Sequence, residues 1–165
     1  MRGKVTTRRG MRRLGSALIA TGLLSAGLIA SAAGASASTA SARSFFSFEV
    51  FLSNNTGCDL VLVTARLDHG EWSRRPPARI KSGRLVSWES ESNGVATGTE
   101  GEADYITENC DPLSNNTKRI HAHWDNPAFG SNSGDAAGTD PAFRTNVVIG
   151  GGHHAGGQFT YFLPE

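Results

Sequence analysis

The chain has 165 residues, of which 38% are hydrophobic, and its 16 basic and 15 acidic residues give a formal net charge of +1. Six basic residues lie among the first 13 positions, so the remainder carries 10 − 15 = −5. Nucleic-acid binding needs clustered Lys and Arg to neutralise phosphates. Because the one downstream cluster, from Arg74 to Arg84, is typical of a solvated loop, we expect no nucleic-acid partner.

Residues 1–42 have the features of an export signal. A cationic start precedes an apolar run from Leu14 to Ala30, and Ala35-Ser36-Ala37 and Ala40-Ser41-Ala42 both fit a cleavage pattern. We therefore predict cleavage near residue 37 or 42 and a secreted, extracellular protein. Twin arginines in the leader leave a folded-state export route open, whereas the interrupted apolar run fits a spanning helix poorly.

The segment that follows, residues 43–165, has the length of one domain. From Phe46 to Leu52 apolar and polar residues alternate, which predicts a strand with one buried face. Asn54-Asn55-Thr56-Gly57 then favours a turn into a second strand from Cys58 to Leu67, and we expect the two to form a hairpin. Cys58 and Cys110 are the only cysteines, and in an exported chain such a pair predicts a disulfide.

Further along the chain, Pro76, Pro77 and Gly83 break the sequence into short extended pieces. More strands are predicted at residues 84–90, 102–107, 118–124, 143–149 and 158–163. Residues 131–139 are rich in Gly, Ser and Asp and predict a long surface loop. No 3.6-residue apolar repeat persists after residue 43, so the fold class is all-β, a single-domain antiparallel β-sandwich of about seven to nine strands.

The order of several motifs resembles the aegerolysin-like family, in its crystal-protein-like branch. These motifs are Leu67-Asp68-His69-Gly70-Glu71-Trp72, Trp88-Glu89-Ser90-Glu91-Ser92-Asn93-Gly94, Thr97-Gly98-Thr99-Glu100-Gly101 and Trp124-Asp125-Asn126-Pro127. The resemblance implies a small actinoporin-like sandwich that binds membrane lipid, of sphingolipid type in some members. It also implies cytolysis as a hemolysin or toxin component, often with a larger pore-forming partner protein.

One segment carries the family's lipid-binding pattern, Tyr-Trp-Asp-Cys-Pro-Trp-Gly-Ser, with changes. Trp124, Asp125 and Pro127 match it directly, while His123 replaces the tyrosine and Asn126 the cysteine. Phe129 is the aromatic residue before Gly130, with one extra residue inserted. The resemblance therefore implies that this segment contributes to a head-group site.

The chemistry of these side chains suggests how a bilayer would be bound. Aromatic rings with one polar edge settle at the membrane interface, so we expect Trp124, Phe129 and Trp72 to point outward and insert. Glu100, His123 and Asp125 would hydrogen-bond a head group. An alternative is a secreted carbohydrate- or protein-binding module that uses the same tryptophans without acting on membranes. For these tryptophans, burial in the core is the competing interpretation.

Enzymatic and metal chemistry receive little support from the sequence. No Gly-x-Ser-x-Gly elbow, His-Glu-x-x-His motif or spare thiol is present, so we expect no enzyme and no cofactor. His121 and His123 share a strand face and could meet His153-His154 at a zinc or copper site. No Cys or carboxylate lies at ligand spacing, which favours hydrogen-bonded strand histidines without a metal.

Overall fold

The computed structural model describes residues 44–164, so the predicted export signal lies outside the described residues. The first strands are β1 (Ser47–Asn55), β2 (Asp59–His69), β3 (Glu71–Arg74), β4 (Arg79–Ile80) and β5 (Arg84–Glu91). They are followed by β6 (Thr99–Glu108), a short 3-10 helix η1 (Leu113–Asn115), β7 (Arg119–Asn126), β8 (Ser133–Asp135), β9 (Arg144–Ile149) and β10 (His154–Phe162). The prediction of an all-β fold is confirmed.

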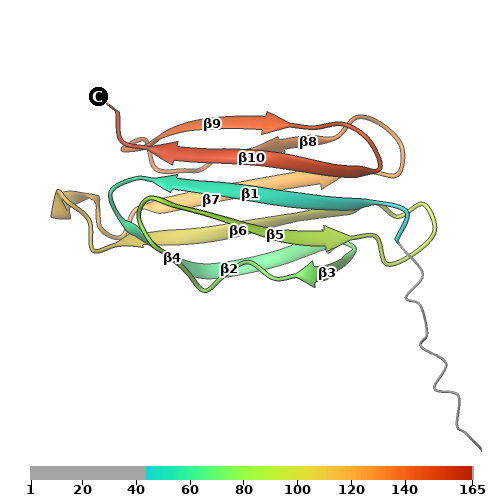
Figure 1. Cartoon of the computed structure of the whole chain (residues 1–165), viewed down its shortest axis with the longest axis horizontal. Coiled ribbons are helices and arrows are strands. Elements are labelled where there is room, and N and C mark those ends of the chain that lie inside the picture. Colours follow the sequence, from blue (N-terminus) through green and yellow to red (C-terminus); the bar gives the residue numbers. More distant parts are fainter. Residues whose placement is uncertain (1–43, 165) are drawn as a thin grey trace, which may run out of the picture. The chain divides into compact units, whose positions relative to one another are not determined.

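The strands form two five-stranded sheets that face one another as a sandwich (Figure 1). We call the first sheet A, with strand order β3-β5-β1-β10-β9, and the second sheet B, with order β4-β2-β6-β7-β8. In sheet A, β1 and β10 pair in parallel, while every other pairing among residues 44–164 is antiparallel. The expectation of a purely antiparallel sandwich is therefore corrected at this one pair, where the first and last strands lie side by side.

The core lies between the two sheets and is formed by every second side chain of the central strands, because successive side chains of a strand point to opposite faces. The predicted face of β1 is confirmed, since Phe48, Val50 and Leu52 are all fully buried. In β6 the alternation is complete over ten residues: every second residue is buried against sheet A, and the residues between them, all charged except Ile106, face outward. The largest core side chains are Trp88, Trp124, Tyr105, Tyr161, Phe48 and Phe159.

The predicted hairpin between the first two strands is wrong, because β1 belongs to sheet A and β2 to sheet B. The chain instead turns a corner between the sheets at residues 55–58. Buried Asn54 stabilises this corner by donating from Nδ2 to the carbonyl oxygens of Cys58 at 2.8 Å and Ile80 at 3.1 Å. The predicted disulfide is confirmed, and Cys58–Cys110 ties the corner to the segment just after β6.

Three short strands, β3, β4 and β8, lie where the sequence predicted extended pieces or a loop. β8 falls inside the predicted surface loop at residues 131–139, and Gly134 lies opposite Trp124 of β7. A Cβ at Gly134 would approach the His123 carbonyl oxygen to 2.9 Å and a methyl group of Ile149 to 2.7 Å. The absence of a side chain at Gly134 therefore lets β8 approach β7 closely. From composition alone, this edge strand is predicted to be a loop.

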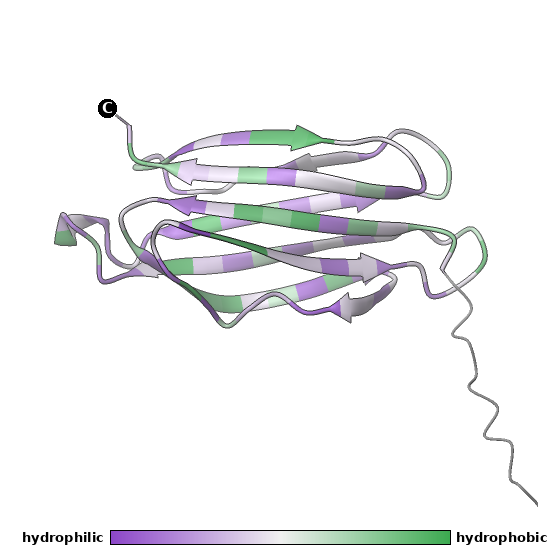
Figure 2. Cartoon of the chain, viewed as in Figure 1, coloured by the Kyte–Doolittle hydropathy of each residue, from purple (hydrophilic) through white to green (hydrophobic). Residues whose placement is uncertain are grey.

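The two ends of the sandwich are built from different segments. We call one the loop end; it holds residues 44–46 before β1 and the connections 92–98, 127–132 and 150–153, at the right of Figure 1. We call the other the disulfide end; it holds the β1–β2 corner, residues 109–118 and the Cys58–Cys110 bond. Hydrophobic colouring reaches the connections of the loop end in Figure 2.

Candidate functional site

Large apolar side chains are exposed to solvent at the loop end. Phe129 is 85% exposed, Val95 84% and Phe45 64%. They come from three segments that are far apart in the sequence and border one pocket of about 340 Å³, which is lined by Phe45, Phe46, Val95, Ala96, Ala128, Phe129 and His153. A contiguous exposed apolar patch of this kind marks a binding surface more often than scattered single residues do.

A second, polar cleft of about 320 Å³ borders the apolar pocket and shares Ala96, Ala128 and Phe129 with it. Its remaining lining residues are His69, Thr97, Thr99, Glu100, Asp125 and Pro127. The structure therefore brings three of the predicted site residues together in one cleft, namely Glu100, Asp125 and Phe129. We call this the head cleft.

The head cleft is acidic, since Glu100 and Asp125 line it and none of its lining residues is Lys or Arg. Burial raises the pKa of Asp125 above its ordinary value, and the neighbouring Glu100 raises it further, against the opposing effect of His123 and His69. Glu100 contacts both histidines, with its Oε1 3.2 Å from His123 Nε2 and its Oε2 3.9 Å from His69 Nε2. The arrangement suits a cationic ligand group that neutralises the two carboxylates.

The loops around the head cleft are fixed by two asparagines. Buried Asn126, at the end of β7, donates from Nδ2 to the carbonyl oxygens of Ser47 at 2.9 Å and His153 at 2.8 Å. Asn132 donates to the carbonyl oxygens of Gly150 at 3.1 Å and Gly152 at 3.0 Å. These bonds join the 127–132 connection to sheet A, so the exposed Phe129 projects from an organised loop.

Trp124 does not point outward, which corrects the expectation that its ring is available to a bilayer. It is fully buried on the inner face of β7 and pairs across the strands with Gly101 of β6. A Cβ at Gly101 would approach Trp124 Cζ2 to 2.9 Å, so the glycine makes room for the indole. The indole nitrogen donates to Ser90 Oγ at 2.9 Å, which satisfies its polar group inside the core.

Trp72 and Trp88 also pack inward. Their rings lie 5.8 Å and 6.0 Å from the ring of Trp124, and Trp88 is fully buried. Trp72 is half-buried against the core, and the Arg75 guanidinium lies 5.8 Å from its ring centre. The ring of Trp72 therefore packs against the core and beneath an arginine while remaining partly exposed, and its insertion into a membrane stays a prediction.

His123 lies on the outer face of sheet B, beside the head cleft and outside its lining residues. Its Nδ1 is 3.3 Å from Asp135 Oδ2, in addition to the Nε2 contact with Glu100. His123 therefore contacts Glu100, which lines the head cleft, without lining the cleft itself. His121, two residues earlier, has its Nδ1 2.8 Å from Asp104 Oδ1.

The predicted alternative of a histidine metal site is not assembled by the strands. His154 lies on sheet A, with its Nδ1 3.1 Å from Ser47 Oγ, whereas His121 and His123 face outward from sheet B. Within residues 44–164, no group of three or more His, Cys, Asp or Glu side chains is placed to hold a metal ion. These histidines hydrogen-bond neighbouring side chains instead.

Sequence reasoning missed Phe45 and Val95 as contributors to this site. Phe45 lies just before β1, so it does not belong to the alternating pattern that places apolar residues of this strand in the core. Val95 directly follows the turn-forming stretch Ser92-Asn93-Gly94, outside any strand, so it has no core face to join. Both signals were present in the sequence as apolar residues outside any predicted strand.

Across residues 44–164 the structure contains no helix with the length and apolar character needed to cross a membrane.

Comparison with known proteins identifies similar folds only. Neither a protein-family model nor a curated protein matches the sequence. Among solved structures, the lipid-binding protein Nakanori is similar with a TM-score of 0.59 and 15% identity, over 70% of each chain. RahU, solved in complex with a Tris molecule, is similar with a TM-score of 0.56 and 14% identity, over 74% of this chain and 97% of RahU. At these identities the likeness shows the β-sandwich fold.

Proposed function

We propose that this protein is a secreted, aegerolysin-like protein that binds membrane lipid through the loop end and has no enzymatic activity. The observation that carries the proposal is the juxtaposition of exposed Phe45, Val95 and Phe129 with the acidic head cleft. A membrane interface presents the same combination, with apolar chains beside polar head groups. The fold similarity to a lipid-binding protein supports this function.

The apolar part of the surface can supply the affinity. Burying one large apolar side chain contributes about 1.5–3 kcal/mol, so Phe129, Val95 and Phe45 together could contribute about 5 kcal/mol or more. Part of this is offset by the loss of motional freedom on binding. The three exposed apolar side chains, held on three segments of the loop end, can therefore drive reversible membrane association.

The polar part of the surface provides the selectivity. Glu100 and Asp125 would attract the ammonium group of a zwitterionic lipid electrostatically, and would also accept hydrogen bonds from it where it carries N–H groups, as in ethanolamine. His123 contacts Glu100 and would position it. Anionic lipids are disfavoured because the cleft contains two carboxylates and no Lys or Arg. Choline and ethanolamine lipids, including sphingolipids, are therefore the proposed ligands.

We extend the proposal to cytolysis with the help of a larger pore-forming partner protein. The support for this step is the resemblance of the sequence motifs to the aegerolysin-like family. In this view the present chain recognises the membrane and its partner forms the pore. Dye release from liposomes by the purified chain alone, at concentrations that saturate binding, would contradict the need for a partner.

The alternative is a secreted carbohydrate- or protein-binding module that does not act on membranes. It depended on tryptophan rings stacking on sugars, and Trp88 and Trp124 are fully buried while Trp72 packs against the core. No other observation favours it over the membrane function.

The experiment is co-sedimentation of the mature protein with liposomes of phosphatidylcholine, sphingomyelin or ceramide phosphoethanolamine, against phosphatidylserine as the anionic comparison. We expect binding to at least one of the ammonium lipids, with less to phosphatidylserine. The variant Val95→Ser/Phe129→Ser should weaken this binding at least tenfold, since it removes most of the exposed apolar surface.

Leu113→Ser is the matched control, because Leu113 is 73% exposed at the disulfide end and far from the head cleft in the fold. It should bind like the unchanged protein. If no liposome composition binds the protein, or if the Leu113 and loop-end variants lose binding equally, the proposed function is wrong.

A further inference from the structure

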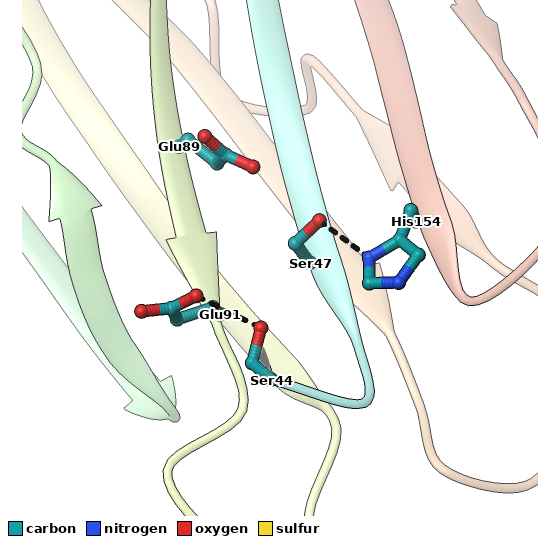
Figure 3. A pocket seen from close by; sticks show the side chains of 5 residues that line it. All are labelled: Ser44, Ser47, Glu89, Glu91 and His154. Atoms are coloured by element: carbon teal, nitrogen blue, oxygen red, sulfur yellow. Dashed lines mark hydrogen bonds between the residues drawn. The ribbon is translucent and has the colours of Figure 1, made fainter. Parts of the chain in front are cut away.

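A second polar cleft, of about 320 Å³, opens on the outer face of sheet A near the loop end. Its lining residues are Ser44, Ser47, Glu89, Glu91 and His154, all of which are drawn in Figure 3. They come from the segment before β1 and from the neighbouring strands β1, β5 and β10. None of them belongs to the head cleft.

Strand register creates this hollow. Ser47 of β1 pairs with Glu91 of β5 on one side and with His154 of β10 on the other. Because cross-strand partners share a face, a small central side chain lies between two longer ones. In the next row on this face, Glu49 lies between Glu89 and Gly156, and the glycine contributes no side chain.

The cleft contains carboxylate acceptors, from Glu89 and Glu91, and a polar floor formed by Ser47. Ser47 is only 8% exposed, and its Oγ lies 3.1 Å from His154 Nδ1. Figure 3 marks this hydrogen bond with a dashed line. Ser44 Oγ donates to Glu91 Oε2 at 2.8 Å (Figure 3). No described residue hydrogen-bonds His154 Nε2, so this atom remains for a ligand.

The negative charge of the cleft lacks a cationic partner within the described residues. Arg74 lies opposite Glu89 in the register, yet its Nη2 contacts Glu49 Oε1 at 2.5 Å. Neither Glu89 nor Glu91 forms an ion pair with any residue from 44 to 164. Glu71, directly opposite Glu91 on β3, adds further negative charge.

The position of this cleft relates it to the proposed membrane surface. Ser44 immediately precedes Phe45, and His154 immediately follows His153, and both of these neighbours line the apolar pocket. The head cleft borders the same pocket from the side of β6 and β7. The apolar pocket thus has an acidic cleft on the sheet A side and another on the sheet B side.

We propose that the cleft of Ser44, Ser47, Glu89, Glu91 and His154 binds an organic ammonium group, as carried by ethanolamine and choline. Glu89 and Glu91 neutralise the cation, and His154 and Ser47 hydrogen-bond the oxygen atoms attached nearby. When the loop end contacts a bilayer, this cleft takes a second lipid head group beside the one in the head cleft. This last step depends on the proposed function.

The test is an NMR titration of the mature protein with soluble phosphoethanolamine and phosphocholine, in a buffer free of amines. We expect shifts of the His154 ring signals and of the Ser47 amide that saturate together. Glu89→Gln/Glu91→Gln should weaken the binding of both probes about tenfold, because it removes the two negative charges that face the ammonium group. Glu49→Gln, on the same face but paired with Arg74, is the matched control and should bind normally.

Absence of saturable shifts at His154 and Ser47, or equal weakening by the Glu49 control, overturns the proposal. A shift pattern that persists in Glu89→Gln/Glu91→Gln overturns it as well. If the double variant folds poorly, Ser47→Ala with its His154 signals provides the same readout, since that change removes one hydroxyl from the cleft floor.

Liposome binding then identifies the source of the ammonium group. If Glu89→Gln/Glu91→Gln also lowers the affinity for ethanolamine or choline liposomes about threefold or more, the cleft takes a lipid head group. If liposome affinity is unchanged while soluble ligand binding is lost, the site is supported and its ligand is a free amine. A protein that binds no liposome yet shows the His154 shifts would overturn the proposed membrane function and leave the ammonium site intact.

Discussion

The two ends of the sandwich differ in what they do with the chain segments that join the strands. At the disulfide end, buried Asn54 and the Cys58–Cys110 bond close the corner between the sheets. At the loop end, buried Asn126 and half-buried Asn132 hold the connections in place, while Phe45, Val95 and Phe129 project into solvent. The difference indicates that one end stabilises the fold and the other presents a binding surface on that stable support.

The strongest test of this division concerns Trp124, which belongs to the stabilising core although its segment resembles the aegerolysin lipid-binding pattern. Trp124→Ala should lower the free energy of unfolding by about 5 kcal/mol, because it creates a large cavity and removes the indole donor from Ser90. Urea denaturation measures this loss. A variant of near-normal stability that no longer binds lipid would instead show an exposed, ligand-contacting ring.

Removal of the disulfide should lower the free energy of unfolding without changing lipid binding at the loop end. Cys58→Ala/Cys110→Ala releases a loop with a sequence separation of 52 residues, which on the chain-entropy model costs about 4 kcal/mol. Thermal and denaturant unfolding report the change. Under conditions where the variant remains folded, liposome binding should be unchanged, and a parallel loss of both properties would contradict the separation of the two ends.

Carboxylates at the two ends should respond oppositely to pH. Hydrogen bonds from Lys81 and Asn109 lower the pKa of Asp59 to about 2 from 3.8. The ionised form is therefore favoured by folding, and its stabilisation is present above about pH 4 and lost as the pH falls toward 2. Asp59→Asn should cost about 2 kcal/mol at neutral pH and nothing near pH 2, and a difference that persists at pH 2 would refute this origin.

Asp125 at the loop end should show the reverse sign. Its pKa is raised by burial and by Glu100, so the ionised form is disfavoured by folding and destabilises the protein at neutral pH. Asp125→Asn should therefore leave stability unchanged or slightly raised at pH 7, while weakening binding to choline or ethanolamine liposomes about fivefold. A variant that binds ammonium lipids as tightly as the unchanged protein would remove Asp125 from the head cleft's function.

The sequence predicted the strands well because alternation is a local signal. The buried face of β1, the strands near β5, β6, β7, β9 and β10, and the disulfide all agree with the structure. The parallel pairing of β1 with β10 and the crossing from β1 to β2 depend on contacts between distant segments, which a single sequence does not reveal. β8 was missed because its Gly-rich stretch has the composition of a loop.

The candidate site shows the same limit. Glu100, Asp125 and Phe129 meet in one cleft as the motif suggested, since β6 and β7 are adjacent strands. The side of the strand was misjudged for Trp124, although Ala122 and Ile120 at two-residue spacing are apolar and mark its face as the inner one. Phe45 and Val95 join the site only through the folded chain.

Depth of insertion tests the central claim most directly. A spin label at position 129 and, separately, one at position 113 can be compared for collisions with oxygen, which partitions into the bilayer, and with a water-soluble nickel complex. With the protein bound to choline or ethanolamine liposomes, the label at 129 should gain oxygen accessibility and lose nickel accessibility, while the label at 113 stays in water. Equal, water-like accessibility at both positions on membrane-bound protein would contradict the assignment of the loop end as the lipid-binding surface.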